Sequence, residues 1–160
     1  MPPGRFLAMV GALIRHPTDH RYLILQRSPE KDFAAGEYEC VTGRVDQGES
    51  FTEALIREVR EELGVDIQIE FILGSTHFYR GPAQPEYEML GVLYCCSINE
   101  PDSIRKSWEH SEFHWVTAEE ARAFLPADHW LLRLILAAER IRDHTDPDLL
   151  VFNQENGFEF

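Results

Sequence analysis

Residues 43–65 read GRVDQGESFTEALIREVREELGV, a glycine-containing loop followed by the pattern of an amphipathic helix. Ser50 and Glu53 are spaced as a capping box, in which each side chain hydrogen-bonds the backbone of the other residue at a helix start. Gly64 is typical of the position that follows a helix end. The apolar residues between these signals recur at helical spacing: Leu55, Ile56, Val59 and Leu63. We therefore predict a helix that begins after Ser50 and ends before Gly64.

Three carboxylates, those of Glu58, Glu61 and Glu62, lie at positions i, i+3 and i+4 of this helix. This spacing puts them on one side of the helix, and we expect them to converge on its polar face. Like charges so close repel each other, and they stay ionised most easily when a hard cation such as Mg²⁺ lies between them. The alternative is that these residues, with Glu53, form only the solvated face of an amphipathic helix.

The spacing of the complete stretch favours the metal site. Its specified positions are Gly43, Glu49, Arg57-Glu58-Val59, Glu61-Glu62 and Gly64-Val65. This pattern matches every specified position of the Nudix signature, and about residues 6–142 resemble a Nudix domain. The resemblance implies an α/β fold, namely an α/β/α sandwich with a mixed β-sheet, in which the helix of the signature carries the metal ligands.

The Nudix resemblance also implies a cofactor and its ligands. Mg²⁺ is the expected metal, with Mn²⁺ as a substitute. The ligands implied by the family are Glu58, Glu61, Glu62 and the backbone carbonyl of Gly43. Arg57 and Glu49 resemble the pair that orients this cluster, although contact with solvent is the alternative for Arg57. Mg²⁺ beside phosphate oxygens neutralises substrate charge and makes water easier to deprotonate, so that water can act as the nucleophile.

A second resemblance concerns the general base. Residues 39–45 (ECVTGRV) and 108–116 (WEHSEFHWV) resemble the bacterial dihydroneopterin triphosphate pyrophosphatase branch, also called dATP pyrophosphohydrolase. In that branch a glutamate that matches Glu109 lies on a loop facing the signature helix and acts as the base. The alternatives for Glu109 are metal coordination or capping of a strand, and Glu112 is the second candidate for the base.

Substrate contacts are predicted from residue chemistry. The guanidinium groups of Arg27 and Arg44 suit phosphate oxygens, although either residue could instead form a surface salt bridge. Tyr79 is a candidate for stacking on a base, with core packing as its alternative. His110 and His114 are four residues apart, but they lie in an expected loop-to-strand region, where this spacing does not predict a zinc site.

Composition limits the class of protein. The chain has 160 residues, a net charge of −13 and 44% hydrophobic residues, which fits one globular domain. The negative charge excludes long DNA or RNA as a partner, because such binding depends on Lys and Arg. No stretch is long and apolar enough to span a membrane, and we expect a cytoplasmic protein with its three cysteines reduced.

The remaining chain alternates strand and helix patterns. Strands are expected at residues 6–14, 22–26, 39–41, 67–80, 86–98 and 114–116, with helices from Thr117 and over residues 129–142. We expect a Nudix domain over residues 1–145 and a tail over 146–160, with a loose segment from about Asp143, because Asp146-Pro147-Asp148 is a helix breaker.

These observations predict a small-molecule, nucleotide-like substrate. The favoured function is Mg²⁺-dependent hydrolysis of a diphosphate linkage in a nucleoside or pterin triphosphate, which releases the monophosphate and pyrophosphate. Dinucleoside polyphosphates rank second and ADP-ribose third. A Nudix domain that binds ligands without catalysis is the alternative of another class, but such domains usually lose signature carboxylates, and this chain keeps them. The oligomeric state is not predicted.

Overall fold

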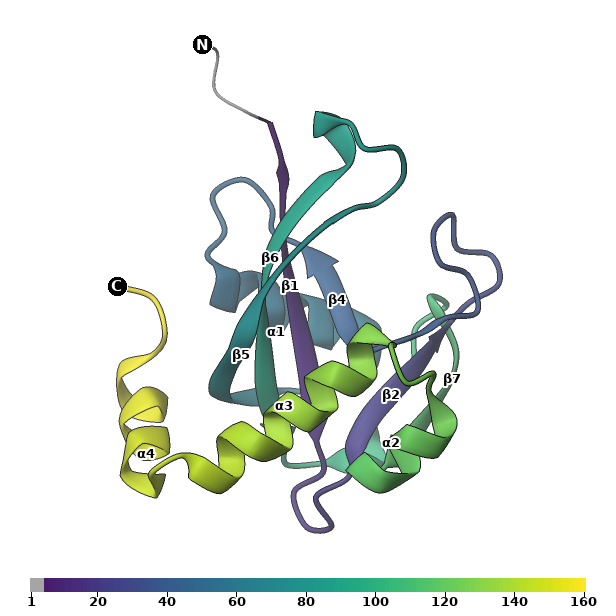
Figure 1. Cartoon of the computed structure of the whole chain (residues 1–160). Helices are drawn as coiled ribbons and strands as arrows, with labels where there is room; N and C mark the ends of the chain where they lie inside the picture. The colour runs from purple at the N-terminus through teal and green to yellow at the C-terminus, as the bar shows by residue number, and fades with distance from the viewer. Residues whose placement is uncertain (1–4) are drawn as a thin grey trace.

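The computed structural model describes residues 5–160, and its centre is a seven-stranded mixed β-sheet (Figure 1). The strands are β1 (Leu7–Arg15), β2 (Tyr22–Arg27), β3 (Tyr38–Glu39), β4 (Val41–Arg44), β5 (Ile67–Tyr79), β6 (Glu88–Ile98) and β7 (His110–Val116). The helices are α1 (Phe51–Leu63), α2 (Ala118–Phe124), α3 (Trp130–His144) and α4 (Pro147–Asn156), with short 3-10 turns at Pro85–Tyr87 and Pro101–Ser103. Of the helices in residues 5–160, none is both long and apolar enough to cross a membrane.

Strand β1 is the centre of the sheet. It runs parallel to β6 along its whole length, and β5 follows as the antiparallel edge strand. On its other side, β1 pairs with β4 through residues 9–12, but it meets β2 only where Arg15 lies opposite Tyr22. β2 continues away from β1 and pairs with β7 and β3. Figure 1 shows the resulting split of the sheet, with β4 on one side and β2 and β7 on the other.

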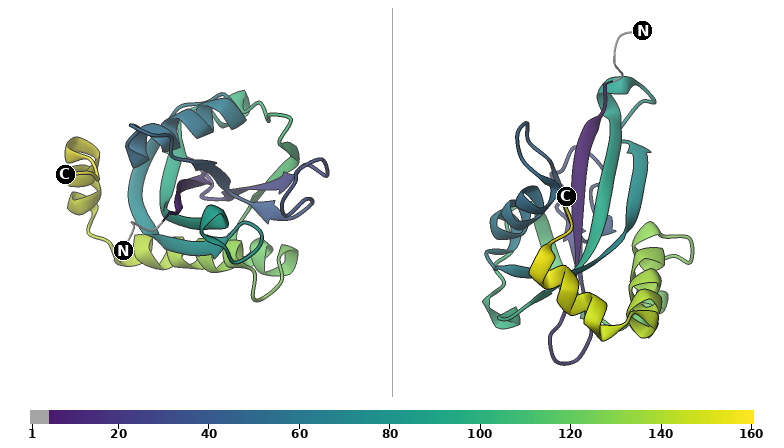
Figure 2. Two further views of the ribbon diagram at one scale, coloured as in Figure 1. Left: turned by 90° about the horizontal axis from the view of Figure 1, so that it is seen from above. Right: turned by 90° about the vertical axis from the view of Figure 1, so that its left-hand side faces the viewer.

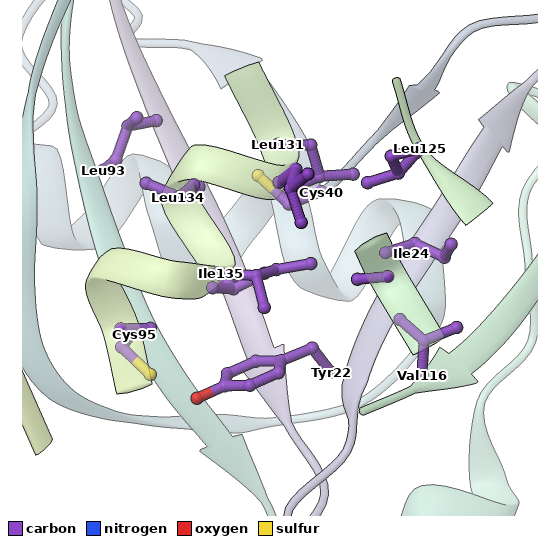
Figure 3. Close-up of a cluster of buried hydrophobic side chains, with 14 of the residues drawn as sticks. Tyr22, Ile24, Cys40, Leu93, Cys95, Val116, Leu125, Leu131, Leu134 and Ile135 are labelled. Atoms are coloured by element: carbon purple, nitrogen blue, oxygen red, sulfur yellow. The ribbon is translucent and has the colours of Figure 1, made fainter. Parts of the chain in front are cut away.

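The sheet separates two apolar clusters, because alternate residues of a strand point to opposite faces. One cluster packs against α3, and it includes Leu13, Tyr22, Ile24, Leu131 and Ile135 (Figure 3). The other packs against α1, and it includes Val10, Ile14, Leu25, Leu55 and Val59. Figure 2 shows α1 and α3 on opposite sides of the sheet, as the predicted α/β/α sandwich requires. The three cysteines are buried and free, and Cys95 and Cys96 lie in different clusters.

Helix α1 has the ends predicted from its sequence. The Ser50 hydroxyl accepts a hydrogen bond from the Glu53 backbone N–H, and the Glu53 carboxylate accepts one from the Ser50 N–H. Gly64 ends the helix in the left-handed conformation, with φ of 69°, which glycine adopts without a steric penalty. The predicted helix is therefore confirmed at both ends.

Two strand predictions need correction. The strand expected at residues 39–41 is two short strands, β3 and β4, which pair with different neighbours, β2 and β1. The strand expected at 114–116 begins four residues earlier, at His110. The pairing of β7 with β2 is irregular there: Glu112 lies opposite Gln26 and His110 opposite Arg27, so that Ser111 is an extra residue.

The segment expected to be loose from Asp143 is ordered instead. α3 continues to His144, and the Asp146 side chain caps α4 while Pro147 occupies its first turn. α4 packs beside β5, and Phe158 packs on the α1 side of the core with its ring 6.1 Å from that of Tyr94. A proline that cannot continue one helix thus starts another.

The Glu159 carboxylate binds the first turn of α1. It accepts hydrogen bonds from the backbone N–H groups of Phe51 at 2.8 Å and Thr52 at 3.1 Å, and from the Thr52 hydroxyl at 2.6 Å. Burial alone would raise the pKa of Glu159, but these hydrogen bonds outweigh it and lower the pKa. A carboxylate at this end of a helix also interacts favourably with the helix dipole.

We predict that Glu159→Ala lowers the free energy of unfolding by about 1 kcal/mol, because α1 loses an N-terminal cap. This corresponds to a melting temperature roughly 2–4 °C lower for a domain of this size, measured by circular dichroism. Glu155→Ala, an exposed residue of the neighbouring α4, is the matched control and should shift the melting temperature much less. Equal shifts for the two variants would exclude the capping role.

Candidate active site

The three glutamates of α1 lie at different depths. The Glu61 side chain is 59% exposed, that of Glu58 14% and that of Glu62 only 4%. The expectation that Glu62 lies on the polar side of the helix was therefore wrong. The split sheet has side chains above this face of α1, and they bury Glu62 while leaving Glu61 at the surface.

Arg57 links the glycine loop to the acidic face of α1. Its Nε and Nη2 bind the two carboxylate oxygens of Glu49 at 2.7 and 2.9 Å. Nη1 donates to Glu58 at 2.8 Å, and Nη2 also donates to the backbone carbonyl of Arg44 at 2.9 Å. The hydrogen bonds from Arg57 lower the pKa of Glu49 to about 2. This geometry fixes the loop and the Glu58 carboxylate relative to each other.

Burial and mutual repulsion affect the two inner glutamates. Burial raises the pKa of Glu58, although Arg57 partly offsets this, and the charges of Glu61 and Glu109 raise it further. Burial also raises the pKa of Glu62 well above its usual value, and the charges of Glu39, Glu109 and Glu58 add to the effect. These carboxylates are therefore close enough to disfavour each other's ionised form, and a nearby cation would favour it.

Glu109 lies directly before β7 and faces this cluster. Its carboxylate forms an ion pair with Lys31, whose ammonium group also lies 5.2 Å from the centre of the exposed Trp108 ring. Lys31 comes from the loop between β2 and β3. A lysine from one loop thus holds the carboxylate that we expect to act as the base.

The backbone around Glu109 is tied to its surroundings. The N–H groups of Arg105 and Ser107 donate to the carbonyls of Leu63 and Glu62, at the C-terminal end of α1, at 2.8 Å each. The Glu109 carbonyl accepts from the Ser28 N–H at 2.7 Å. These bonds use helix carbonyls that have no partner within α1, and they set the position of Glu109 relative to the helix.

Glu112 points to the other face of the sheet. Its carboxylate lies 3.0 Å from His114 Nε2 and accepts a hydrogen bond from the Tyr38 hydroxyl at 3.2 Å. Hydrogen bonds from His114 and Tyr38 lower its pKa. The rings of His114 and Tyr38 both pack near Phe124 of α2, away from α1. Glu112 therefore lies away from the carboxylates of α1, whereas Glu109 faces them.

The three residues predicted to contact the substrate differ in exposure and in their place in the fold. Arg27 is mostly buried: its Nη1 binds both oxygens of Glu39 at 2.7 Å, and its Nε donates to the Phe33 carbonyl at 2.9 Å. Arg27 is thus held in a mostly buried ion pair, whereas the alternative considered from the sequence was a surface salt bridge. Arg44 is exposed next to Gly43, and Tyr79 is exposed at the end of β5.

The donor set suits a hard divalent cation. It consists of carboxylate oxygens, and the buried Oε2 of Glu62 has no hydrogen-bond partner. At Gly43, an added Cβ would lie 1.8 Å from Cδ of Glu58, so only glycine lets the two approach so closely. Within residues 5–160, however, no three His, Cys, Asp or Glu side chains already converge in metal-binding geometry. The expected convergence is thus incomplete, because Glu58 turns to Arg57 and Glu61 to solvent.

Three residues of this site were not predicted from sequence: Lys31, Glu39 and His110. Lys31 and Glu39 lie in or beside a loop, where no periodicity indicates which way a side chain points. His110 was considered only as a zinc ligand with His114, yet the two side chains point to opposite faces. The nearest sequence signal was Glu39-Cys40-Val41, a buried strand pattern that contains a charged residue.

Comparisons with known proteins test the family that the sequence suggests. The NUDIX domain family matches residues 6–137. CTP pyrophosphohydrolase of Escherichia coli (strain K12) is 30% identical over 144 residues, which cover 86% of this chain and 97% of that protein.

Solved structures give the same result for the fold. The MutT protein from Methanosarcina mazei Go1 aligns with a TM-score of 0.71 and 25% identity, covering 91% of this chain and all of that chain. The E. coli dihydroneopterin triphosphate pyrophosphohydrolase aligns with a TM-score of 0.62 and 21% identity, covering 88% of this chain and 99% of that one. Since the family match spans most of the chain and contains the whole carboxylate cluster of α1, the chain belongs to the NUDIX family and is a Nudix hydrolase.

Proposed function

We propose that this Nudix hydrolase uses Mg²⁺ to cleave a nucleoside or pterin triphosphate into the monophosphate and pyrophosphate. One observation carries the proposal: Glu58, Glu61 and Glu62 are all present on α1, and Glu109 faces them from the start of β7. Bound Mg²⁺ would neutralise phosphate charge and lower the pKa of water. Mn²⁺ is the proposed substitute, since it also prefers oxygen ligands.

The residues of the chain then have separate roles. Glu58, Glu61, Glu62 and the Gly43 carbonyl are the proposed metal ligands. Arg57 holds Glu58 and the glycine loop in place through its bonds to both. Glu109 accepts the proton of the attacking water, and the ion pair with Lys31 keeps its carboxylate in one position.

Substrate binding requires positive charge, because the protein is strongly acidic overall. Arg44 is exposed beside the proposed metal ligands, and we propose that it binds phosphate oxygens. Tyr79 is exposed at the end of β5 and is the proposed contact for the base. A triphosphate is favoured over ADP-ribose and dinucleoside polyphosphates because CTP pyrophosphohydrolase is similar to this chain over nearly its whole length.

The products test the proposed reaction. With Mg²⁺ and a panel that contains CTP, dATP and dihydroneopterin triphosphate, we expect equal amounts of monophosphate and pyrophosphate, measured by anion-exchange chromatography. Stepwise release of orthophosphate through the diphosphate would contradict the proposal. Turnover of only ADP-ribose or dinucleoside polyphosphates would replace the substrate class, and nucleotide binding without turnover would indicate a ligand-binding module.

Gly43→Ala should act through Glu58. The new Cβ would overlap Cδ of Glu58, which is the far end of a flexible side chain, so the carboxylate can move at little cost to the fold. We expect Mg²⁺-dependent turnover to fall about tenfold or more, with only a small change in melting temperature. Because the effect passes through Glu58, the double variant Gly43→Ala, Glu58→Gln should lose no more activity than Glu58→Gln alone. Additive losses would refute this coupling.

Glu109→Gln separates the base from a metal ligand. If Glu109 is the base, we expect kcat to fall roughly 100-fold to 10,000-fold, while the Mg²⁺ concentration for half-maximal rate changes little. A metal ligand would instead weaken Mg²⁺ binding, and excess Mg²⁺ would restore part of the rate. Glu112→Gln is the matched variant on the other face of β7 and should keep nearly full activity. A severe loss in Glu112→Gln with a normal rate in Glu109→Gln would assign the base to Glu112.

A further inference from the structure

His110 is a buried residue between two glutamates. It is only 2% exposed, although it is the first residue of β7 and follows the surface residues Trp108 and Glu109. Its Nε2 lies 3.1 Å from Oε1 of Glu39, and its Nδ1 lies 3.7 Å from Oε2 of Glu62. The imidazole ring thus stands between β3 and the buried glutamate of α1.

The Glu39 side of this arrangement is fully bonded. Arg27 binds both carboxylate oxygens of Glu39 at 2.7 Å, and the Thr42 hydroxyl donates to Oε2 at 3.1 Å. Charge-assisted hydrogen bonds of this kind fix a carboxylate firmly. Glu39 in turn fixes the orientation of the His110 ring, because the ring nitrogen Nε2 lies within hydrogen-bond distance of its Oε1.

The contact between His110 and Glu62 is not a hydrogen bond. Nδ1 of His110 and Oε2 of Glu62 both lack a hydrogen-bond partner in the described residues, and both are fully buried. They face each other slightly beyond hydrogen-bond distance. Buried polar atoms without partners are costly, and a small movement of either side chain would bring these two atoms within hydrogen-bond distance of each other.

The irregularity in β7 puts His110 in this position. Phe113 and Trp115 pack on the α1 side of the sheet, while Glu112 and His114 point to the other side. Regular alternation would turn His110 to the side of Glu112. The extra residue at Ser111 reverses this, so that His110 points toward α1. The bulge thus turns the His110 side chain toward the candidate active site.

We propose that His110 is a positioning residue that orients the Glu62 carboxylate toward the metal, with Glu39 and Arg27 as its support. The inference rests on the proposed function, since it requires Glu62 to be a metal ligand. A hydrogen bond from His110 Nδ1 would hold Oε2 of Glu62 and leave Oε1 for the cation. Partners of this kind, behind a metal ligand, typically change metal affinity 10-fold to 100-fold when they are removed.

Two amide variants separate the two sides of the ring. The amide of Gln lies near the place of Nε2 and keeps the contact with Glu39, whereas the amide of Asn lies near the place of Nδ1 and can contact Glu62. Mn²⁺ alone is the probe, and its affinity is measured from the electron paramagnetic resonance signal of the free ion. His114→Gln, on the opposite face of the same strand, is the control.

We expect His110→Gln to weaken Mn²⁺ binding roughly 10-fold to 100-fold. His110→Asn should recover a large part of this loss, and His114→Gln should bind as the wild type does. If His110 had only a structural role, the loss of Mn²⁺ affinity in each variant would follow its loss of thermal stability. It would not depend on whether the introduced amide lies near the place of Nε2 or of Nδ1. Wild-type affinity in His110→Gln, or equal losses in the two amide variants, would overturn the proposal.

Glu62→Gln distinguishes this failure from a failure of the proposed function. If Glu62→Gln weakens Mn²⁺ binding and His110→Gln does not, the proposed metal site is supported and the positioning role of His110 is refuted. If Glu62→Gln binds Mn²⁺ as the wild type does, both the metal-ligand role of Glu62 and the positioning role of His110 are refuted.

Should the His110 variants not fold, histidine labelled with ¹⁵N in the wild type and in Glu62→Gln gives a second measurement. One imidazole Nδ1 signal should shift between them, and unchanged signals would overturn the proposal.

Discussion

Electrostatic repulsion between carboxylates is the constraint on which the rest of this structure depends. The carboxylates gather between α1 and the start of β7: Glu58, Glu61, Glu62 and Glu109. Two cationic side chains oppose this repulsion from different loops, since Arg57 binds Glu58 and Lys31 binds Glu109. Within the described residues, neither cation forms an ion pair with Glu62, the most buried of the group, although the charge of Lys31 partly offsets the rise in its pKa. The site therefore keeps an excess of negative charge at its centre, where a divalent cation would be bound most strongly.

The scaffold holds both halves of the site through a single helix. The first turn of α1 is bonded by its capping box and by Glu159, which follows α4 in the chain. Its last carbonyls accept hydrogen bonds from the segment that leads to Glu109. Movement of α1 would thus shift the proposed metal ligands and the proposed base together. The distance between them is preserved even where the split sheet provides no strand pairing across the site.

Features that depend on local periodicity could be predicted from the sequence. Features that depend on tertiary contacts, such as the burial and direction of a side chain, could not. The caps of α1 follow from local sequence, and they are confirmed, whereas the expected convergence of Glu58, Glu61 and Glu62 is incomplete in residues 5–160. The burial of Glu62 could not be predicted, because it depends on β7 lying above that face of the helix. His110 points inward only because of the bulge at Ser111, and no period-2 pattern predicts a bulge. The segment from about Asp143 was predicted to be loose because Asp146-Pro147-Asp148 is a helix breaker, yet Pro147 occupies the first turn of α4.

The depth of each glutamate implies a division of roles on α1. Glu62 is nearly inaccessible, so its carboxylate cannot turn to solvent without a rearrangement of its neighbours. Glu61 is largely exposed and has only a 3.4 Å contact with Arg57, so it can change rotamer at low cost. Glu58 is intermediate in exposure, and as a proposed metal ligand it would exchange its contact with Arg57 for one with the cation. As proposed metal ligands, one fixed inner glutamate and two adjustable outer ones would let the site adapt to phosphate oxygens.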